Sequence, residues 1–426
     1  MAGRITLIDA AQIFDSRGMP TLSVTVVTDD GTAAIASVPS GASTGEHEAV
    51  ELRDGDEGRF GGRGVDIAVG NVRREIADRL RGADVADQAA IDRAMIELDG
   101  TPNKARLGAN AILGVSMAAA RAAAQVRSIP LYRHLGGADA TLMPVPMMNV
   151  LNGGKHADNS LDFQEFMIAP IGAPSFSEAM RYGVGTYHAL KAILHARGLA
   201  TAVGDEGGFA PNLADNEAAC ALIVEAIERA GFRLGKDLAI ALDPAASSFG
   251  DEGRYVLQGE KRAVLDTDAL LALYGRWLER YPIVSIEDGF GENDWSAFVR
   301  QTQEQGHRVQ IVGDDLFVTN PVFIERGIAE RAANAALIKL NQIGTLTETI
   351  EAIRLCDAAG WATMVSHRSG ETDDSFIADL AVAMGSGQIK SGAPCRGERL
   401  AKYNRLLAIE RELGSHARYH NPFVRA

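Results

Sequence analysis

The chain has 426 residues, of which 46% are hydrophobic and 23% charged, and its formal net charge is −14 at pH 7. This composition is typical of a globular protein, and the length predicts two domains or one barrel with an added domain. The acidic surplus argues against general affinity for nucleic acids and anionic membranes, which requires an excess of Lys and Arg. A small anionic substrate stays open, because a few cations can set the local field.

Cysteine usage and hydropathy favour a cytoplasmic protein. Cys220, Cys356 and Cys395 are widely spaced and form no CxxC pattern, so we expect reduced thiols. The N-terminal residues lack the basic and apolar regions of a signal peptide. The alanine-rich run 109–126 comes closest to a membrane span, but Asn110 and Arg121 interrupt it.

Residues 1–137 predict a small α+β domain. Two β-branched runs within residues 4–39 flank Asp-Asp-Gly, a pattern typical of an antiparallel hairpin. A Gly/Ser-rich loop follows, and helical periodicity extends over 65–80, 84–98 and 108–127. Pro130 and the Gly136-Gly137 pair mark the exit, so we place the domain boundary near 137–142.

Residues 138–426 predict an α/β fold, an atypical (β/α)₈ barrel. The strand-like runs 143–154 and 162–170 are too close for a crossover helix and are expected to pair antiparallel. Helices are then expected at about 175–197 and 215–231. Six strand-like runs follow, each before a helix, at 238–243, 282–288, 309–315, 335–340, 362–367 and 387–390. The helices are expected at 266–281, 294–305, 320–332, 345–359, 373–384 and 396–413. A doubly wound open sheet is the alternative, but it would not need so many repeats.

Each of these six strand-like runs changes from apolar to polar at its carboxyl end. The polar residues are Asp243, Glu287 with Asp288, Asp314 with Asp315, Lys339, His367 with Arg368, and Lys390. In a (β/α)₈ barrel these ends meet at one mouth, where such enzymes have their active sites. One such residue could simply solubilise a strand end, but six in succession predict one functional site.

Carboxylates on three consecutive strands indicate a metal site. Asp243, Glu287 and Asp314 would repel one another without a cation, and oxygen ligands without Cys or His favour Mg²⁺ over Zn²⁺. Asp288 and Asp315 are the adjacent alternatives, because strand alternation lets only one residue of each pair point directly into the barrel. Taken singly, each acid is equally well explained as a helix cap or an ion-pair partner.

The following strands carry basic residues. Arg368 could clamp a carboxylate or phosphate, and Lys390 adds positive charge. Lys339 lies inside an apolar run, where burial beside cations should lower its pKa towards neutrality, as a general base requires. The alternative is a lysine paired with an acid for structural reasons. Glu206, in a Gly-rich loop, could complete an acid/base pair with Lys339.

Ten motifs, in order from about residue 5 to residue 410, together resemble the enolase family. They are SGASTGEHEA, LGANAILGVSMA, NGGKHADN, QEFMI, VGDEGGFAPNL, SIEDGF, VGDDLFVTN, IKLNQIGTLTET, SHRSGET and IKSGAPCRGERLAKYN. The resemblance implies a small cap domain followed by a ββαα(βα)₆ barrel. It also implies reversible dehydration of 2-phosphoglycerate to phosphoenolpyruvate in glycolysis and gluconeogenesis, the reaction of a hydro-lyase. A Lys or His base with one or two Mg²⁺ ions is already the known pattern of this superfamily.

The resemblance also implies roles for individual residues. Asp243, Glu287 and Asp314 match Mg²⁺ ligands, Lys339 matches the base and Glu206 the acid. The remaining active-site and substrate-binding positions match His156, Glu165, His367, Arg368, Ser369 and Lys390. Ser43, on an expected mobile loop at 39–47, matches the residue that binds a second Mg²⁺ once substrate is present.

Two departures and two alternative functions remain. Pro244 stands where the family more often has Cys, Val or Met, and Ser248 stands where it more often has Glu. Proline fixes φ and removes an N–H, so the geometry beside Asp243 could shift.

The chain could instead be an acid-sugar dehydratase of the same superfamily. It could also be a scaffold in an RNA-degrading assembly or at the cell surface, reached without a signal peptide. The tail YHNPFVRA has no lysine of the kind that surface-displayed relatives often use to bind plasminogen, so we do not expect that role. The family forms homodimers or octamers, so a homo-oligomer is expected.

Overall fold

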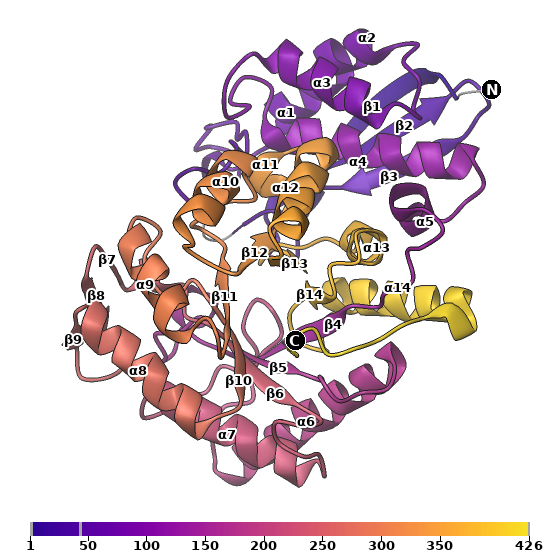
Figure 1. Cartoon of the computed structure of the whole chain (residues 1–426). Coiled ribbons are helices and arrows are strands. Elements are labelled where there is room, and N and C mark those ends of the chain that lie inside the picture. The colour runs from indigo at the N-terminus through magenta and orange to yellow at the C-terminus, as the bar shows by residue number, and fades with distance from the viewer. Residues whose placement is uncertain (1–2, 42–44, 425–426) are drawn as a thin grey trace.

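The structure is a computed structural model that describes residues 3–41 and 45–424. A small N-terminal part lies above a larger barrel, and the two are in contact along one side (Figure 1). Ser43 and the centre of the 39–47 loop lie outside the described residues. None of the described helices is long and apolar enough to cross a membrane.

A three-stranded antiparallel sheet and a row of helices form the N-terminal part. The strands are β1 (Ile5–Phe14), β2 (Pro20–Thr28) and β3 (Ala33–Ser37), which confirms the predicted hairpin. The helices are α1 (Asp66–Asn71), a π-helical turn (Val72–Ile76), α2 (Ala77–Leu80), α3 (Gln88–Asp99), α4 (Ala109–Val126) and α5 (Leu131–Gly136). Helix α4 packs on the sheet so closely that a Cβ on Gly114 would lie 2.5 Å from Val24 Cγ2. The small residues of α4 therefore make this close packing possible.

Eight strands of the described chain close into a barrel in the order β10-β11-β12-β13-β14-β4-β5-β6. Their bounds are β4 (Val145–Asn152), β5 (Glu165–Ala169), β6 (Ala239–Asp243), β10 (Ile283–Glu287), β11 (Gln310–Gly313), β12 (Ala335–Ile338), β13 (Ala362–Ser366) and β14 (Gln388–Lys390). Strand β5 runs antiparallel to both β4 and β6, and the other neighbouring pairs are parallel. The predicted barrel with an irregular start is confirmed.

Helices surround the barrel where the sequence predicts them. They are α6 (Phe176–Ala196), α7 (Asn216–Arg229), α8 (Thr267–Arg280), α9 (Trp295–Gln305), α10 (Pro321–Glu330), α12 (Leu346–Ala358), α13 (Phe376–Ala383) and α14 (Gly397–Leu413). Side-chain caps fix several of these starts; Asp266, for example, accepts a hydrogen bond from the amide of Ala269 at the start of α8. Helix α12 and the short α11 (Leu340–Ile343) lie against α3 and α4 of the N-terminal part (Figure 1).

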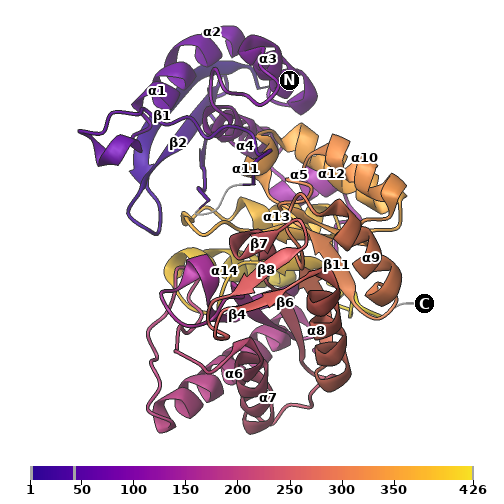
Figure 2. The ribbon, with the colours of Figure 1, turned by 90° about the vertical axis from the view of Figure 1, so that its left-hand side faces the viewer.

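Short elements were not predicted. A small antiparallel sheet of β7 (Gly250–Asp251), β8 (Arg254–Leu257) and β9 (Ala263–Leu265) lies on the outside of the barrel, in front of it in Figure 2. The helices α5 and α11 were also missed. These segments have only two to six residues, too few to show a helical or strand periodicity.

Candidate active site

The six predicted polar residues all lie at carboxyl ends of barrel strands. Asp243, Glu287 and Lys390 are the last residues of β6, β10 and β14, and Asp314, Lys339 and His367 immediately follow β11, β12 and β13. They surround one cavity at the mouth of the barrel. Its lining consists of His156, Gln164, Glu165, Glu206, Asp243, Ala245, Asp288, Asp314, Asp315, Lys339, Ser366, His367, Arg368, Ser369 and Lys390. Ten of the predicted site residues therefore line one cavity. Glu287 is not one of the lining residues, but it contacts Lys390, which is.

Lys390 lies among three buried carboxylates. Its Nζ is 2.8 Å from Asp243 Oδ2, 2.8 Å from Glu287 Oε1 and 3.0 Å from Glu165 Oε1. Burial disfavours the ammonium, but these carboxylates outweigh burial and raise the pKa of Lys390 well above its ordinary value. Burial and the charge of Asp243 raise the pKa of Glu287 well above its usual range. One lysine therefore does not neutralise this acidic group.

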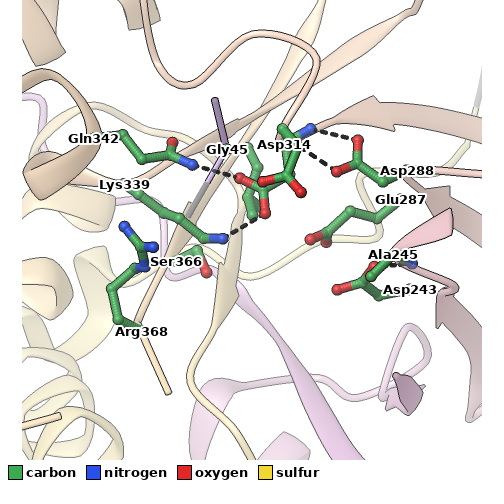
Figure 3. A network of polar contacts seen from close by, with 12 residues as sticks. Gly45, Asp243, Ala245, Glu287, Asp288, Asp314, Lys339, Gln342, Ser366 and Arg368 are labelled. Carbon is green, nitrogen blue, oxygen red and sulfur yellow. Dashed lines mark hydrogen bonds and ion pairs between the residues drawn. The ribbon is translucent and has the colours of Figure 1, made fainter. Parts of the chain in front are cut away.

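The acidic half of the site fits a cation. Glu287 is 1% exposed, and its Oε2 has no hydrogen-bond partner among the described residues. Asp243, Glu287 and Asp314 project towards the same region (Figure 3). In the described chain, two other groups have ligand atoms that all lie within 4.8 Å of one another: Asp288 with Asp314 and Asp315, and His156 with Glu165 and Glu206. A buried unpaired carboxylate oxygen and an excess of negative charge are what a hard divalent cation would satisfy.

Asp288 has a structural role, which distinguishes it from the adjacent Glu287. Its Oδ1 accepts the amide of Asp314 at 2.9 Å and its Oδ2 accepts the amide of Asp315 at 2.8 Å. Both carboxylate oxygens are thus engaged by the backbone of the next strand end. Asp288 thereby fixes the turn that carries Asp314, whose side chain reaches into the site (Figure 3).

Lys339 pairs with Asp314. The Nζ of Lys339 donates to Asp314 Oδ2 in a short contact (Figure 3). Burial by itself lowers the pKa of Lys339, but the attraction of Asp314 outweighs it, so that this pKa is raised. The sequence-based expectation of a lowered pKa is therefore wrong for this arrangement, because the partner of Lys339 is a carboxylate.

Glu165 and Glu206 form a buried acid pair beside His156. His156 Nδ1 lies 3.8 Å from Glu165 Oε1 and 3.8 Å from Glu206 Oε1. Burial and the charge of Glu206 raise the pKa of Glu165 well above its ordinary value. Burial also favours the neutral form of Glu206, but His367 and His156 outweigh it and hold the pKa of Glu206 well below its usual range. The surroundings therefore favour the protonated form of Glu165 and the charged form of Glu206.

Arg368 forms the basic end of the cavity and is itself buried. Its NH1 is 3.0 Å from Glu48 Oε2, its NH2 is 3.2 Å from Glu48 Oε1, and its NH1 also donates to Asn341 Oδ1 at 2.8 Å. Glu48 belongs to the segment that follows the 39–47 loop. The N-terminal part thus supplies a carboxylate to the barrel's arginine.

Sequence reasoning missed several residues of this site as functional candidates. Gln164 and Ser366 line the cavity, Glu48 pairs with Arg368, and Gln342 Nε2 donates to Asp314 Oδ1 at 2.9 Å. Gln342 is three residues after Lys339, and its burial at 1% exposure is the signal that only the structure reveals. Glu48 lies in the motif SGASTGEHEA, but it is distant in sequence from every barrel strand, so its contact with Arg368 could not be predicted.

Comparisons with known proteins agree with this geometry. Residues 5–135 match the family model described as the enolase N-terminal domain, and residues 140–425 match the enolase C-terminal TIM barrel domain. Enolase 1 of Methylococcus capsulatus is 62% identical, with 98% of this chain and 100% of the relative covered. Enolase of Desulfotalea psychrophila is 58% identical over 99% of this chain and 100% of the relative. Enolase of Acidothermus cellulolyticus is 60% identical over 97% of this chain and 96% of the relative. The chain therefore belongs to the enolase family of hydro-lyases.

Proposed function

We propose that this chain dehydrates 2-phosphoglycerate to phosphoenolpyruvate, reversibly, with Lys339 as the base at C2 and Glu206 as the acid at C3. The overall reaction is that of a phosphopyruvate hydratase, the activity of the family. The residue roles rest on one observation: Lys339 and the Glu165/Glu206 pair line the same cavity, beside the acidic group of Asp243, Glu287 and Asp314. A base and an acid on one substrate cavity are what loss of water from adjacent carbons requires.

Lys339 takes the C2 proton in this proposal. The amine must be neutral to act as a base, and in the present state the Asp314 carboxylate favours the protonated, ammonium form of Lys339. Arg368 and Lys390 both lower the pKa of Lys339. The Lys339 amine therefore becomes neutral, and able to act as a base, at neutral pH only when another partner binds the Asp314 carboxylate.

Asp243, Glu287 and Asp314 would hold a divalent cation, and Mg²⁺ suits this set of hard oxygen ligands. When bound, Mg²⁺ supplies positive charge to the substrate carboxylate as C2 loses its proton. We extend the proposal to a second Mg²⁺ at Ser43 once substrate is present. Among these three residues, Glu287 has a poorly compensated charge, since its pKa is raised and its Oε2 has no hydrogen-bond partner among the described residues.

Glu206 gives its proton to the departing C3 hydroxyl. Glu206 must be protonated for this step, and Glu165, whose raised pKa favours its protonated form, has a carboxylate oxygen within 4.8 Å of one of Glu206. Arg368, Ser369, Lys390 and His367 would bind the anionic groups of the substrate, since Arg368 and Lys390 bring positive charge and Ser369 and His367 bring hydrogen-bonding groups to the cavity. Lys390 does so from within the acidic group, where it also pairs with Asp243 and Glu287.

The wider setting of the enzyme is also part of the proposal. We divide the chain into a capping domain at 1–137 and a catalytic barrel at 138–426. We expect a cytoplasmic homodimer or octamer. Partners in an RNA-degrading assembly or at a cell surface would be additional to catalysis, because the residues assigned to the reaction are all present in the chain.

The test is an assay of 2-phosphoglycerate turnover, followed by the absorbance of phosphoenolpyruvate, with and without Mg²⁺. We expect turnover with Mg²⁺ and its loss on addition of a chelator. Sugar acids serve as the competing substrates. Turnover of a sugar acid without turnover of 2-phosphoglycerate would overturn the assignment.

A further inference from the structure

We propose that Thr319 and Gln342 together orient the carboxylate of Asp314, and thereby act as positioning residues for metal binding. This inference rests on the proposed role of Asp314 as a metal ligand. Gln342 is 1% exposed and Thr319 is 0% exposed, and neither lines the substrate cavity. Gln342 lies beside Asp314 on the side opposite Glu287 and Asp243 (Figure 3).

The orientation of the Gln342 amide is fixed from both ends. The amide N–H of Lys339 can only donate, and it donates to Thr319 Oγ1 at 2.9 Å. The Thr319 hydroxyl donates its own proton to Gln342 Oε1 at 2.8 Å, and the other acceptor within reach, the carbonyl of Leu337, is farther away at 3.5 Å. The Nε2 of Gln342 is then directed at Asp314 Oδ1, a pure acceptor, at 2.9 Å. Amide orientations are usually ambiguous in structures, but this chain of donors and acceptors allows only one.

The backbone at Thr319 is strained in a way that serves this contact. Val318 and Thr319 have φ of 44° and 55°, in the left-handed region that β-branched residues rarely adopt. Strained conformations persist where surrounding structure enforces them, and they cluster at functional sites. Here the turn after β11 places the Thr319 hydroxyl between the backbone of Lys339 and the Gln342 amide. The strain is thus an independent indication that the position of this hydroxyl matters.

Gln342 also connects the metal site with the N-terminal part. Its Nε2 lies 3.4 Å from Glu48 Oε1, and its backbone carbonyl accepts the amide of Ala49 at 2.8 Å. Glu48 is in turn paired with Arg368. One side chain therefore contacts the metal ligand Asp314 and the carboxylate that occupies the anion-binding arginine.

Orientation of Asp314 matters because Lys339 competes for the carboxylate. Lys339 binds Oδ2 of Asp314, and Gln342 holds Oδ1. Without Gln342 the carboxylate could rotate to follow Lys339, which would remove an oxygen from the metal-binding region. Partners that orient a metal ligand typically contribute a factor of about 10 to 100 to metal affinity.

The experiment measures Mg²⁺ binding by calorimetry on the full chain without substrate, so that turnover plays no part. We expect Gln342→Met and Thr319→Val to weaken Mg²⁺ binding by about 10-fold or more. Thr319→Ser keeps the hydroxyl and is expected to bind Mg²⁺ as the parent chain does. Thermal unfolding in EDTA establishes that each variant is folded before its affinity is compared.

The outcomes separate this inference from the proposed function. Asp314→Asn should weaken Mg²⁺ binding, and if it does not, the metal site itself is wrongly assigned. If Asp314→Asn weakens binding while folded Gln342→Met and Thr319→Val bind normally, the positioning role alone is refuted. Equal losses in Thr319→Ser and Thr319→Val would also refute it, because the hydroxyl would then be irrelevant.

Discussion

The two ends of the barrel interior use the same strands for opposite purposes. Strands β10, β11 and β14 carry Ser285, Gln310 and Gln388 towards their amino ends. Two to four residues further on, the same strands lead to Glu287, Asp314 and Lys390 at the mouth. The first set is neutral and the second is charged.

The neutral layer satisfies itself. Gln310 and Gln388 exchange two amide hydrogen bonds of 2.9 Å, and Gln310 Nε2 also lies 3.1 Å from Ser285 Oγ. Tyr419 and Phe423, from the C-terminal tail, pack against the apolar residues of the barrel interior. Buried polar groups with all their partners present stabilise a unique structure.

The charged layer is not self-sufficient. Glu165 Oε2 and Glu287 Oε2 are buried without hydrogen-bond partners in the described part of the chain, and the pKa values of both groups are raised. A fold keeps such costly groups when a ligand satisfies them. The difference between the two layers shows where binding energy for metal and substrate is to be found.

The largest expected effect is at the mouth. Lys339→Ala should lower kcat by about 10⁴-fold, because a positioned general base contributes up to this factor. Mg²⁺ binding should be largely retained, since the three carboxylates stay. Steady-state kinetics and calorimetry measure the two quantities, and Lys191→Ala, at an exposed position on α6, is the matched control. Normal turnover by Lys339→Ala would exclude Lys339 as the base.

The second prediction concerns metal-dependent stability. Mg²⁺ at 100 times its Kd should stabilise the fold by about 2.7 kcal/mol through mass action. Glu287→Gln should lose most of this gain, because it removes a charged ligand from the acidic group. Unfolding midpoints with Mg²⁺ and with EDTA measure the gain, and Glu279→Gln, exposed on α8, is the control. A full Mg²⁺ effect in Glu287→Gln would show that the metal binds elsewhere.

The third prediction concerns the neutral layer. Gln388→Met should destabilise the chain by about 1–3 kcal/mol, because it leaves Gln310 Oε1 buried without its donor, while Gln310 Nε2 keeps only Ser285 Oγ. The double variant Gln310→Met/Gln388→Met should recover part of this loss, since both partners are then apolar. Denaturant unfolding measures the stability, and kcat should stay near that of the parent chain. A large loss of kcat in a folded Gln388→Met variant would contradict the view that the neutral layer serves stability and the charged layer serves function.

The smallest effect is expected at Asp237, just before the amino end of β6. Arg233 donates to it from its side chain and its backbone, and these bonds lower the pKa of Asp237 to about 2. Asp237→Asn should lower the free energy of unfolding by only about 0.5–1 kcal/mol at neutral pH, because the Arg233 side chain is 72% exposed and solvent screens the pair.

The pH dependence of this contribution has a definite sign. Because its pKa in the folded chain is below the ordinary 3.8, Asp237 stabilises the fold above about pH 4 and loses this effect as pH falls towards 2. Glu287 should behave oppositely in EDTA, since its raised pKa makes its contribution fall as pH rises. Unfolding midpoints across pH for Asp237→Asn and Glu287→Gln, each compared with the parent chain, test both directions. If the contributions of Asp237 and Glu287 change in the same direction with pH, the expected difference between them is wrong.

Local sequence patterns were enough to predict the barrel, its antiparallel start and the group of residues at its mouth. Strand and helix periods are local, and residues at the carboxyl ends of barrel strands must converge once the barrel closes. Asp243, Glu287, Lys339 and Lys390 could therefore be assigned to one site without coordinates. Short elements such as β7–β9 escaped, because two to four residues carry no period.

The pairing of these groups, in contrast, became known only from the folded chain. The sequence could not reveal that Asp314 pairs with Lys339 and raises its pKa, that Asp288 binds backbone amides, or that Glu48 reaches Arg368. Such pairings join residues 25 to 320 positions apart, and no local pattern records them. The pKa of a buried group follows its nearest charges, so the direction for Lys339 could be read only after its partner was known.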